Sequence, residues 1–181
     1  EFQVQIVKDG VPVHTARVVV GRPQNQTPVF SNAIQFIVVN PYWNVPPSIA
    51  AKEIQPHLIN DPNYLASQNM ELLSGAKVVD ASAIDWSSAN INNYHVRQKP
   101  GGLNALGQVK FLFPNDQDVY LHDTPSKSLF ARSYRAYLHG CVRVQNPLDF
   151  AGALLATNPG ITEDTIKAQF GDSEKWITLK T

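Results

Sequence analysis

The stretch QVKFLFPNDQDVYLHD, residues 108–123, predicts two β-strands joined by a turn. Each half is rich in β-branched and aromatic residues, and Pro-Asn-Asp-Gln separates them, which is the pattern of a hairpin. Because side chains alternate along a strand, Val119 and Leu121 share one face, and Tyr120 and His122 share the other. If the aliphatic pair packs into the core, His122 points out of it.

Strand patterns continue on both sides of this hairpin. The first 45 residues alternate between apolar and polar positions, with turn residues at Asp9-Gly10, so we expect a β-meander. The run KWITL at 175–179 is typical of a closing strand. Helices that begin at Pro147 and after an N-cap at Thr162 are expected at the periphery. The sequence therefore predicts a mainly β, α+β fold with peripheral helices.

Residues 46–102 have a different texture. A helix capped by Ser48 is predicted to end near Pro56, and residues 80–104, rich in Asn, Ser and Gly, favour exposed, mobile loops. We therefore expect one domain over 1–181, with a helical lobe inserted at 46–102.

The composition limits both size and partners. With 181 residues, 43% of them apolar, the chain can bury one sizeable core and is short for two full domains. Lys+Arg 15 balance Asp+Glu 15, so no net field favours nucleic acid, and we expect no nucleic-acid partner. No apolar run approaches the roughly 18 residues that span a bilayer. Because the chain begins with Glu1 in a strand-like segment, we expect upstream domains and a targeting signal outside it.

Cys141 is the single cysteine of the chain and cannot form a disulfide within it. It can be a packed core residue, a metal ligand, an intermolecular bridge or a nucleophile. A nucleophilic thiol needs a base or cation, donors for the oxyanion that forms on attack, and a backbone open to substrate. Gly140 removes the side chain beside the thiol, and the amide of Cys141 is a candidate oxyanion donor.

Two histidines are candidates for the base. His139 is nearer in sequence, but in an extended segment residues two apart are separated by over 6 Å, roughly, which is too far for a short hydrogen bond. We therefore favour His122 as the base and His139 as a wall of the site. A half-buried structural role remains an alternative for His122, and a turn cap for His139.

The segment 122–145 is locally basic. It holds Lys127, Arg132, Arg135 and Arg143 against Asp123, a balance of plus three in a neutral chain. Such a region attracts an anionic substrate, although Lys127 and Arg132 also fit a solvated loop. Arg143 lies two residues from the thiol, where a planar guanidinium suits a bidentate contact with a carboxylate.

The pair YLHDTP at 120–125 and LHGCVRV at 138–144 resembles the catalytic signature of the YkuD family of L,D-transpeptidases. That signature has a histidine and, after a spacer, Ser/Thr-His-Gly-Cys followed by an aliphatic residue and Arg or Asn. Leu138 departs from it, because it stands where the signature has Ser or Thr. Further stretches, among them VVGRPQNQTPVFS and NPYWNVPPSIAAKEI, resemble the YcbB-type branch of Gram-negative bacteria, in which a capping lobe is inserted into the catalytic domain.

The resemblance implies a β-sandwich or partly open barrel and a reaction of two acyl transfers. The thiolate of Cys141 would attack the carbonyl between diaminopimelate and the terminal D-alanine of a peptidoglycan tetrapeptide stem. The amine of a second stem's diaminopimelate would then take the acyl group, giving a 3→3 cross-link. His122 would be the base, held by the backbone carbonyl of Asp123, and the amides of Gly140 and Cys141 would stabilise the oxyanion.

The resemblance also implies a place in peptidoglycan biosynthesis and cell shape, no cofactor and no metal, acylation by carbapenems, and a periplasmic or cell-envelope location. We expect four residues to contribute to substrate binding: Tyr120, Arg135, His139 and Arg143. The acceptor, a stem peptide or an envelope protein, stays open at this point, as does the oligomeric state.

Three other interpretations compete with cross-linking. If water takes the acyl group, the same site is an L,D-carboxypeptidase or endopeptidase. A domain with an inactive site would be a wall-binding module. A zinc site built from His122, His139 and Cys141 matches no usual ligand spacing.

Overall fold

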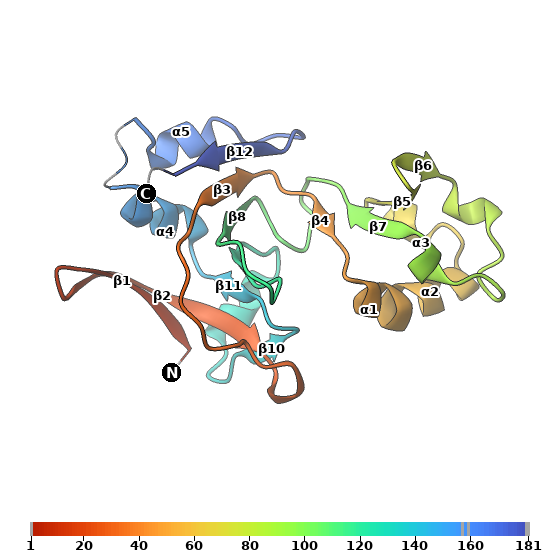
Figure 1. Ribbon diagram of the computed structural model, residues 1–181, viewed down its shortest axis with the longest axis horizontal. Helices are drawn as coiled ribbons and strands as arrows, with labels where there is room; N and C mark the ends of the chain where they lie inside the picture. The colour runs from red at the N-terminus through yellow and green to blue at the C-terminus, as the bar shows by residue number, and fades with distance from the viewer. Residues whose placement is uncertain (1, 157, 159, 180–181) are drawn as a thin grey trace.

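In the computed structural model, which describes residues 2–156, 158 and 160–179, the chain forms a body and a lobe, each with its own sheet. The body sheet has the strand order β1-β2-β11-β9-β8-β3-β12, with β10 also paired to β2, and the lobe sheet has the order β4-β7-β5-β6. Figure 1 shows the lobe, built from the middle of the chain, beside the body that holds both chain ends. The mainly β, α+β class is confirmed, with open sheets that do not close into a barrel over the described residues.

The elements of the body are mostly short strands. They are β1 (Gln3–Lys8), β2 (Val11–Gly21), β3 (Phe36–Val39), β8 (Val109–Leu112), β9 (Leu121–His122), β10 (Ala136–Leu138), β11 (Val142–Val144), β12 (Lys175–Thr178), α4 (Pro147–Leu155) and α5 (Glu163–Lys167), with 3-10 turns η1 (Pro23–Asn25) and η5 (Lys127–Ala131). Both predicted hairpins are present, β1-β2 and β8-β9, and so is the closing strand β12. The predicted helix starts are also confirmed, at Pro147 for α4 and after the Thr162 cap for α5.

The prediction of a β-meander at the start is wrong. After β2, the chain leaves the hairpin, and β3 pairs with β8 and β12, whereas β2 pairs with β11 and β10. Alternation marks a strand but does not name its partner, which is chosen by burial of the sheet face. Val19 of β2 and Val144 of β11 are both 0% exposed, and this cross-sheet placement buries them.

The two faces of the body sheet differ. One face packs apolar strand residues such as Ile37, Phe111 and Val144 against Phe150 of α4 and Ile166 of α5. The other face carries Lys110, His122 and Arg143 in one row of directly paired positions on β8, β9 and β11. The core thus fixes the strands from behind, and the polar row faces away from it.

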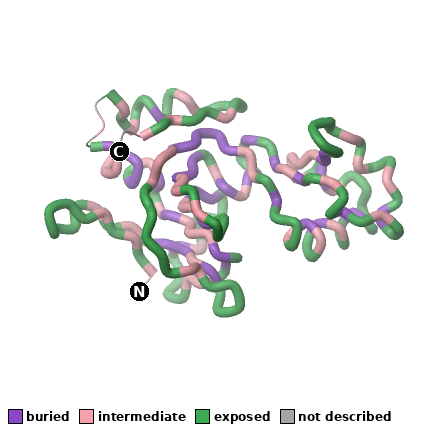
Figure 2. The backbone as a smooth tube through the Cα atoms, viewed as in Figure 1, coloured by how far each residue is buried: buried purple, intermediate pink, exposed green. Residues whose placement is uncertain are grey.

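The lobe is α+β rather than helical. Its elements are β4 (Trp43–Asn44), α1 (Pro47–Ile49), the π-helical turn η2 (Ala50–Ile54), α2 (Gln55–Asn60), α3 (Tyr64–Ser67), β5 (Met70–Ser74), β6 (Lys77–Val79), the 3-10 turns η3 (Ala81–Ala83) and η4 (Ile91–Asn93), and β7 (His95–Gln98). They enclose a core separate from that of the body, with Leu58, Leu72 and Ile91 almost wholly buried (Figure 2).

Two local predictions in the lobe are wrong. The helix begins at Pro47, without a Ser48 cap, and runs through Pro56: Gln55 N–H donates to Ala50 O in a π turn, and proline needs no donor in the next turn. Residues 80–104 are not simply loops, because they contain the central strand β7 and the buried Trp86.

Buried amide side chains hold the junction between lobe and body. Asn104, 0% exposed, donates to Pro41 O at 2.9 Å and accepts from Leu106 N at 2.8 Å. Gln98 binds Leu103 O and Ala105 N, so both chain crossings are tied to each other. No helix among the described residues has the length and apolar character to cross a membrane.

Candidate active site

Three neighbouring strands bring the candidate residues together on one face of the body sheet. Arg143 of β11 is paired with His122 of β9, and His122 is paired with Lys110 of β8. Directly paired residues share a face, and so do residues two apart on one strand, which adds Cys141 beside Arg143 and Tyr120 beside His122. The structure therefore gathers four of the predicted residues and adds Lys110, which the sequence analysis did not single out.

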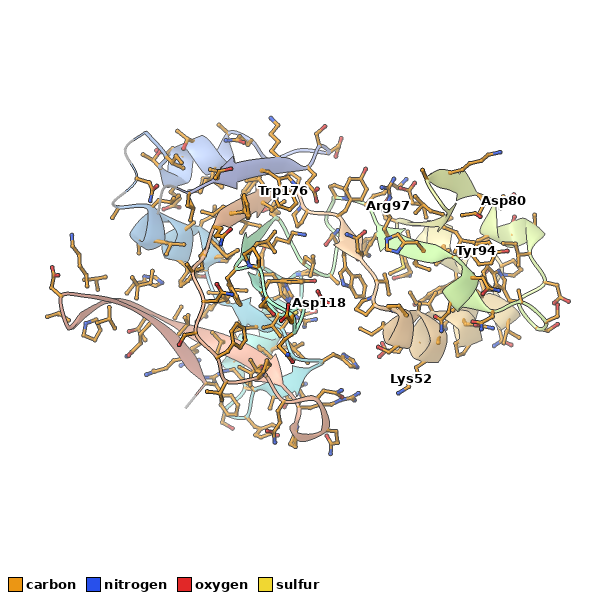
Figure 3. All side chains as sticks on the ribbon, in the orientation of Figure 1. Lys52, Asp80, Tyr94, Arg97, Asp118 and Trp176 are labelled. Atoms are coloured by element: carbon orange, nitrogen blue, oxygen red, sulfur yellow. The ribbon has the colours of Figure 1, made fainter. Side chains whose placement is uncertain are left out.

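The Cys141 thiol is free and half-buried just before β11. Its Sγ donates to Asp118 O at 3.6 Å, and Asp118 lies on the lobe side of the body in the view of Figure 3. Burial raises the pKa of Cys141 above that of an ordinary thiol, although hydrogen bonding from Tyr120 and the charge of Arg143 act in the opposite direction. The resting nucleophile is therefore a neutral thiol at pH 7.

His122 is 4% exposed and held in one tautomer. Its Nδ1 lies 2.5 Å from the backbone carbonyl of Asp123, and because a carbonyl only accepts, Nδ1 carries the proton and Nε2 is left as the basic atom. Burial, and then the charge of Arg143, lowers the pKa of His122 to about 3. The hydrogen bonds of the described residues include none between this imidazole and the Cys141 thiol, so the two are unpaired in this state.

Tyr120 lies against both groups. Its ring is edge-on to His122, with centroids 5.7 Å apart, and its phenol hydrogen-bonds the Cys141 thiol. Burial is the main cause that raises the pKa of Tyr120, so the phenol keeps its proton. Lys110 Nζ lies 5.6 Å from the centroid of the same ring. Tyr120 thus contacts the nucleophile itself.

The Gly140–Cys141 peptide is oriented by Thr27. The Thr27 hydroxyl donates to Gly140 O at 2.7 Å and accepts from Gly21 N at 3.0 Å. Because a trans peptide is planar, this bond also fixes the Cys141 N–H, which points to the opposite side. Among the residues that the structure describes, none accepts from the Gly140 or Cys141 amide, which leaves both as oxyanion donors. Gly140 has a φ of +127°, a conformation that a side chain disfavours.

Asp123 contributes its carbonyl rather than its carboxylate. The carboxylate accepts from Gln108 N at 3.0 Å and from Lys127 Nζ, on the far side of the strand from the thiol. These contacts pin the end of β9 and hence the carbonyl that orients His122. Asp123 is therefore a positioning residue in this geometry.

His139 faces the lobe. Its Nε2 lies 3.1 Å from Arg22 Nη2 and 3.3 Å from Glu53 Oε1, which belongs to η2 of the lobe. His139 thus connects the rim of the site to the lobe. Of the described His, Cys, Asp and Glu side chains, no three form a group that could hold a metal ion, so the zinc interpretation finds no support.

The structure does not bring Arg135 to the thiol. Its guanidinium donates to three backbone carbonyls, those of Val18, Arg132 and Phe2, so its observed contacts are structural. Leu138 is also turned away from the site and packs with Val19 and Phe130 in a small apolar cluster.

Comparison with known proteins agrees with this arrangement. The family model for YkuD, described as the L,D-transpeptidase catalytic domain, matches residues 1–162. The chain belongs to the YkuD family. A relative from Haemophilus influenzae (strain ATCC 51907 / DSM 11121 / KW20 / Rd), named "Putative L,D-transpeptidase", is 40% identical over 156 residues, 85% of this chain and 32% of the relative. The chain therefore spans about a third of that relative's length.

Membership of the YkuD family confirms the enzyme class that the two sequence motifs predicted. The matched range includes Cys141 and His122, together with the whole lobe. The YcbB-type branch and a capping role for the lobe stay predictions. Thr27 and Lys110 carried no signal in the sequence, because their partners lie on strands and loops remote along the chain.

Proposed function

We propose that this L,D-transpeptidase domain forms 3→3 cross-links between the diaminopimelate residues of peptidoglycan stems, through an acyl-enzyme on Cys141. The observation that carries the proposal is the meeting of a thiol, a neutral imidazole and unpaired backbone amides at one end of β9 and β11. Acyl transfer requires these three elements. The corresponding location is the periplasm of a Gram-negative bacterium.

The first half-reaction acylates the enzyme. The Cys141 thiol turns from the Asp118 carbonyl and passes its proton to Nε2 of His122 while Sγ attacks the carbonyl carbon of diaminopimelate. The oxyanion that forms is stabilised by the amides of Gly140 and Cys141. Collapse breaks the amide bond, His122 returns the proton to the leaving amine, and D-alanine departs from a thioester.

The proton states of the empty site explain why the base is needed. Burial raises the pKa of Cys141 and lowers that of His122 to about 3, so a thiolate-imidazolium pair is disfavoured before substrate binds. Proton transfer therefore accompanies attack instead of preceding it. This mode of activation also protects a half-buried thiol from unselective reaction in the absence of substrate.

The second half-reaction transfers the acyl group. The side-chain amine of a second stem's diaminopimelate attacks the thioester, His122 accepts its proton, and Cys141 leaves and is reprotonated. Water in place of the amine would give hydrolysis. We assign the lobe the role of a lid that excludes water on the acceptor side, which His139 and Glu53 border. A carbapenem carbonyl would occupy the donor carbonyl's place and acylate Cys141.

The test is mass spectrometry of muropeptides after incubation with disaccharide-tetrapeptide. The wild-type protein and Cys141→Ala are compared, and each is also incubated with a carbapenem. We expect cross-linked dimers and a covalent carbapenem adduct that both require Cys141.

Each other outcome overturns a defined part of the proposal. Tripeptide monomers without dimers would make the domain a carboxypeptidase, and cleavage of preformed dimers alone would make it an endopeptidase. Binding of muropeptides without any mass change in substrate or protein would make it a wall-binding module. Dimers formed equally by Cys141→Ala would remove the thiol from the mechanism.

A further inference from the structure

Two cations flank His122 on the active-site face, and neither has an anionic partner. Lys110 is 8% exposed, so it is more than nine-tenths buried, yet no hydrogen bond or ion pair of its ammonium occurs among residues 2–156, 158 and 160–179. Its described contacts are the rings of Tyr120 and Trp176, whose centroids lie 5.6 and 5.9 Å from Nζ. A lysine that is buried to this extent without a carboxylate is unusual.

Arg143 has the same deficit. Its Nε is buried and lacks an acceptor, and the described part of the chain offers its guanidinium no carboxylate. Arg143 and Lys110 lie on the two strands that border His122, so their Cα atoms are two strand spacings, roughly 10 Å, apart. Long side chains at that separation can converge on one small anion in front of His122.

The buried acidic groups of this region are committed elsewhere. The Asp123 carboxylate binds Gln108 N and Lys127 on the opposite side of the strand. Glu174 accepts from Tyr42 N at 2.7 Å and from Trp176 Nε1 at 3.0 Å, and acts on Lys110 only at longer range. The two cations are therefore left for a group that is not part of the protein.

We infer that Lys110 and Arg143 form a binding site for a carboxylate of the donor peptide, placed across His122 from Cys141. A flat two-oxygen anion matches the planar fork of Arg143 and the point charge of Lys110 better than a spherical ion does. The inference rests on the proposed function for the identity of its ligand, since the donor stem carries free carboxylates next to the bond that is cut.

Binding there also acts on the base. Arg143 and Lys110 both disfavour the imidazolium form of His122, which lowers its pKa. A substrate carboxylate would neutralise this effect and restore proton affinity to Nε2 only when the donor is bound. The site then couples substrate recognition to activation of the thiol.

Alkylation of Cys141 tests the site without any turnover. Iodoacetate and iodoacetamide are close in size and form the same bond, Sγ to the methylene carbon with loss of iodide, but only iodoacetate carries a carboxylate. Any change in thiol reactivity affects both reagents, so the ratio of their rate constants isolates the anion site. We expect this ratio to exceed that of free N-acetylcysteine in the wild type, and to fall roughly tenfold in Lys110→Met.

Two control variants accompany Lys110→Met. Lys110→Arg keeps the charge and should keep most of the ratio. Lys167→Met removes a lysine of α5 that pairs with Glu163, away from the site, and should leave the ratio unchanged. Should Lys110→Met fold poorly, the wild-type ratio is measured against added acetate and salt, both of which should lower it. A ratio equal to that of N-acetylcysteine, or insensitive to Lys110, overturns the inference.

Donor analogues identify the carboxylate. One tetrapeptide is amidated at its terminal D-alanine and another at the side-chain carboxyl of diaminopimelate. The wild type should lose kcat/KM on one analogue, and Lys110→Met and Arg143→Ala should show no further loss on that analogue, with an effect mainly on KM. If the alkylation ratio behaves as expected but no donor is turned over, the anion site stands and the proposed function fails. Equal losses by the variants on all three peptides overturn the carboxylate assignment.

Discussion

The body and the lobe differ in what they bury. The body buries His122, Asp123 and Lys110 behind the active-site face, and its sheet joins segments as remote as β2 and β11. The lobe has its own apolar core, around Leu72 and Trp86, and its sheet pairs segments close in sequence. The difference teaches that the chemistry depends on long-range assembly of the body, whereas the lobe is a nested unit whose perturbation need not reach the thiol.

The largest effect is expected from Cys141→Ala. Loss of the nucleophile in the body should reduce donor turnover by at least about a thousandfold, equivalent to roughly 4 kcal/mol of barrier, with no loss of folding. Release of D-alanine and the thermal unfolding curve are measured side by side. Turnover within tenfold of the wild type would contradict the assignment of chemistry to this face.

The second effect is on the pH dependence of the body's stability. The pKa of His122 in the folded state is about 3, below its ordinary 6.5, so between pH 6.5 and 3 the unfolded chain binds the proton and the native state does not. Stability should therefore fall with pH across this window, by about 1.4 kcal/mol per unit and up to about 4 kcal/mol in total. Urea denaturation at several pH values measures the slope, and His122→Gln should flatten it. Identical slopes would contradict the burial of a neutral imidazole.

The third effect separates the two cores. Leu72→Ala should destabilise the lobe by about 2–5 kcal/mol because it leaves a cavity at a side chain that is 1% exposed. Hydrogen exchange should show lost protection in β5 and β7, while iodoacetamide labels Cys141 at a rate within twofold of the wild type. The matched variant Ile37→Ala, in the body, should lower protection in β8 instead. Faster thiol labelling in Leu72→Ala would show that the lobe core supports the site.

The fourth effect concerns the oxyanion amide. Thr27→Val removes the donor that holds Gly140 O, so the Cys141 N–H loses its fixed direction, and acylation by a carbapenem or the donor should fall about tenfold to a hundredfold. Alkylation by iodoacetamide forms no oxyanion and should be unchanged. Thr27→Ser retains the hydroxyl and should restore acylation. A parallel fall in both reactions would point to general damage rather than to orientation of the amide.

The smallest effect is expected at the contact between lobe and body. Glu53 and His139 are both well exposed, so Glu53→Gln should change the free energy of unfolding by less than about 0.5 kcal/mol. Chemical denaturation measures this change, and the ratio of dimers to tripeptides measures any influence on the lid. A loss of more than 1 kcal/mol would show that this exposed pair, rather than the buried amides of Gln98 and Asn104, fixes the junction.

The sequence by itself determined the local elements and the two central residues of the site. Turn residues and alternation predicted the β1-β2 and β8-β9 hairpins, and proline at the first helical position predicted α4. Cys141 and His122 were accessible for the same reason, since each lies in a short motif whose geometry is local. Local rules succeed where the deciding contacts lie within a few residues.

Only the tertiary structure decided the order of the strands and the partners of the polar groups. Thr27 reaches Gly140 across 113 residues, and Lys110 became part of the site only because β8 pairs beside β9. In the same way Arg135, basic and near the thiol in sequence, is bound to backbone carbonyls elsewhere. Periodicity states which face of a strand a side chain occupies, but burial of the whole sheet decides which strands lie next to each other, and that choice sets the chemistry.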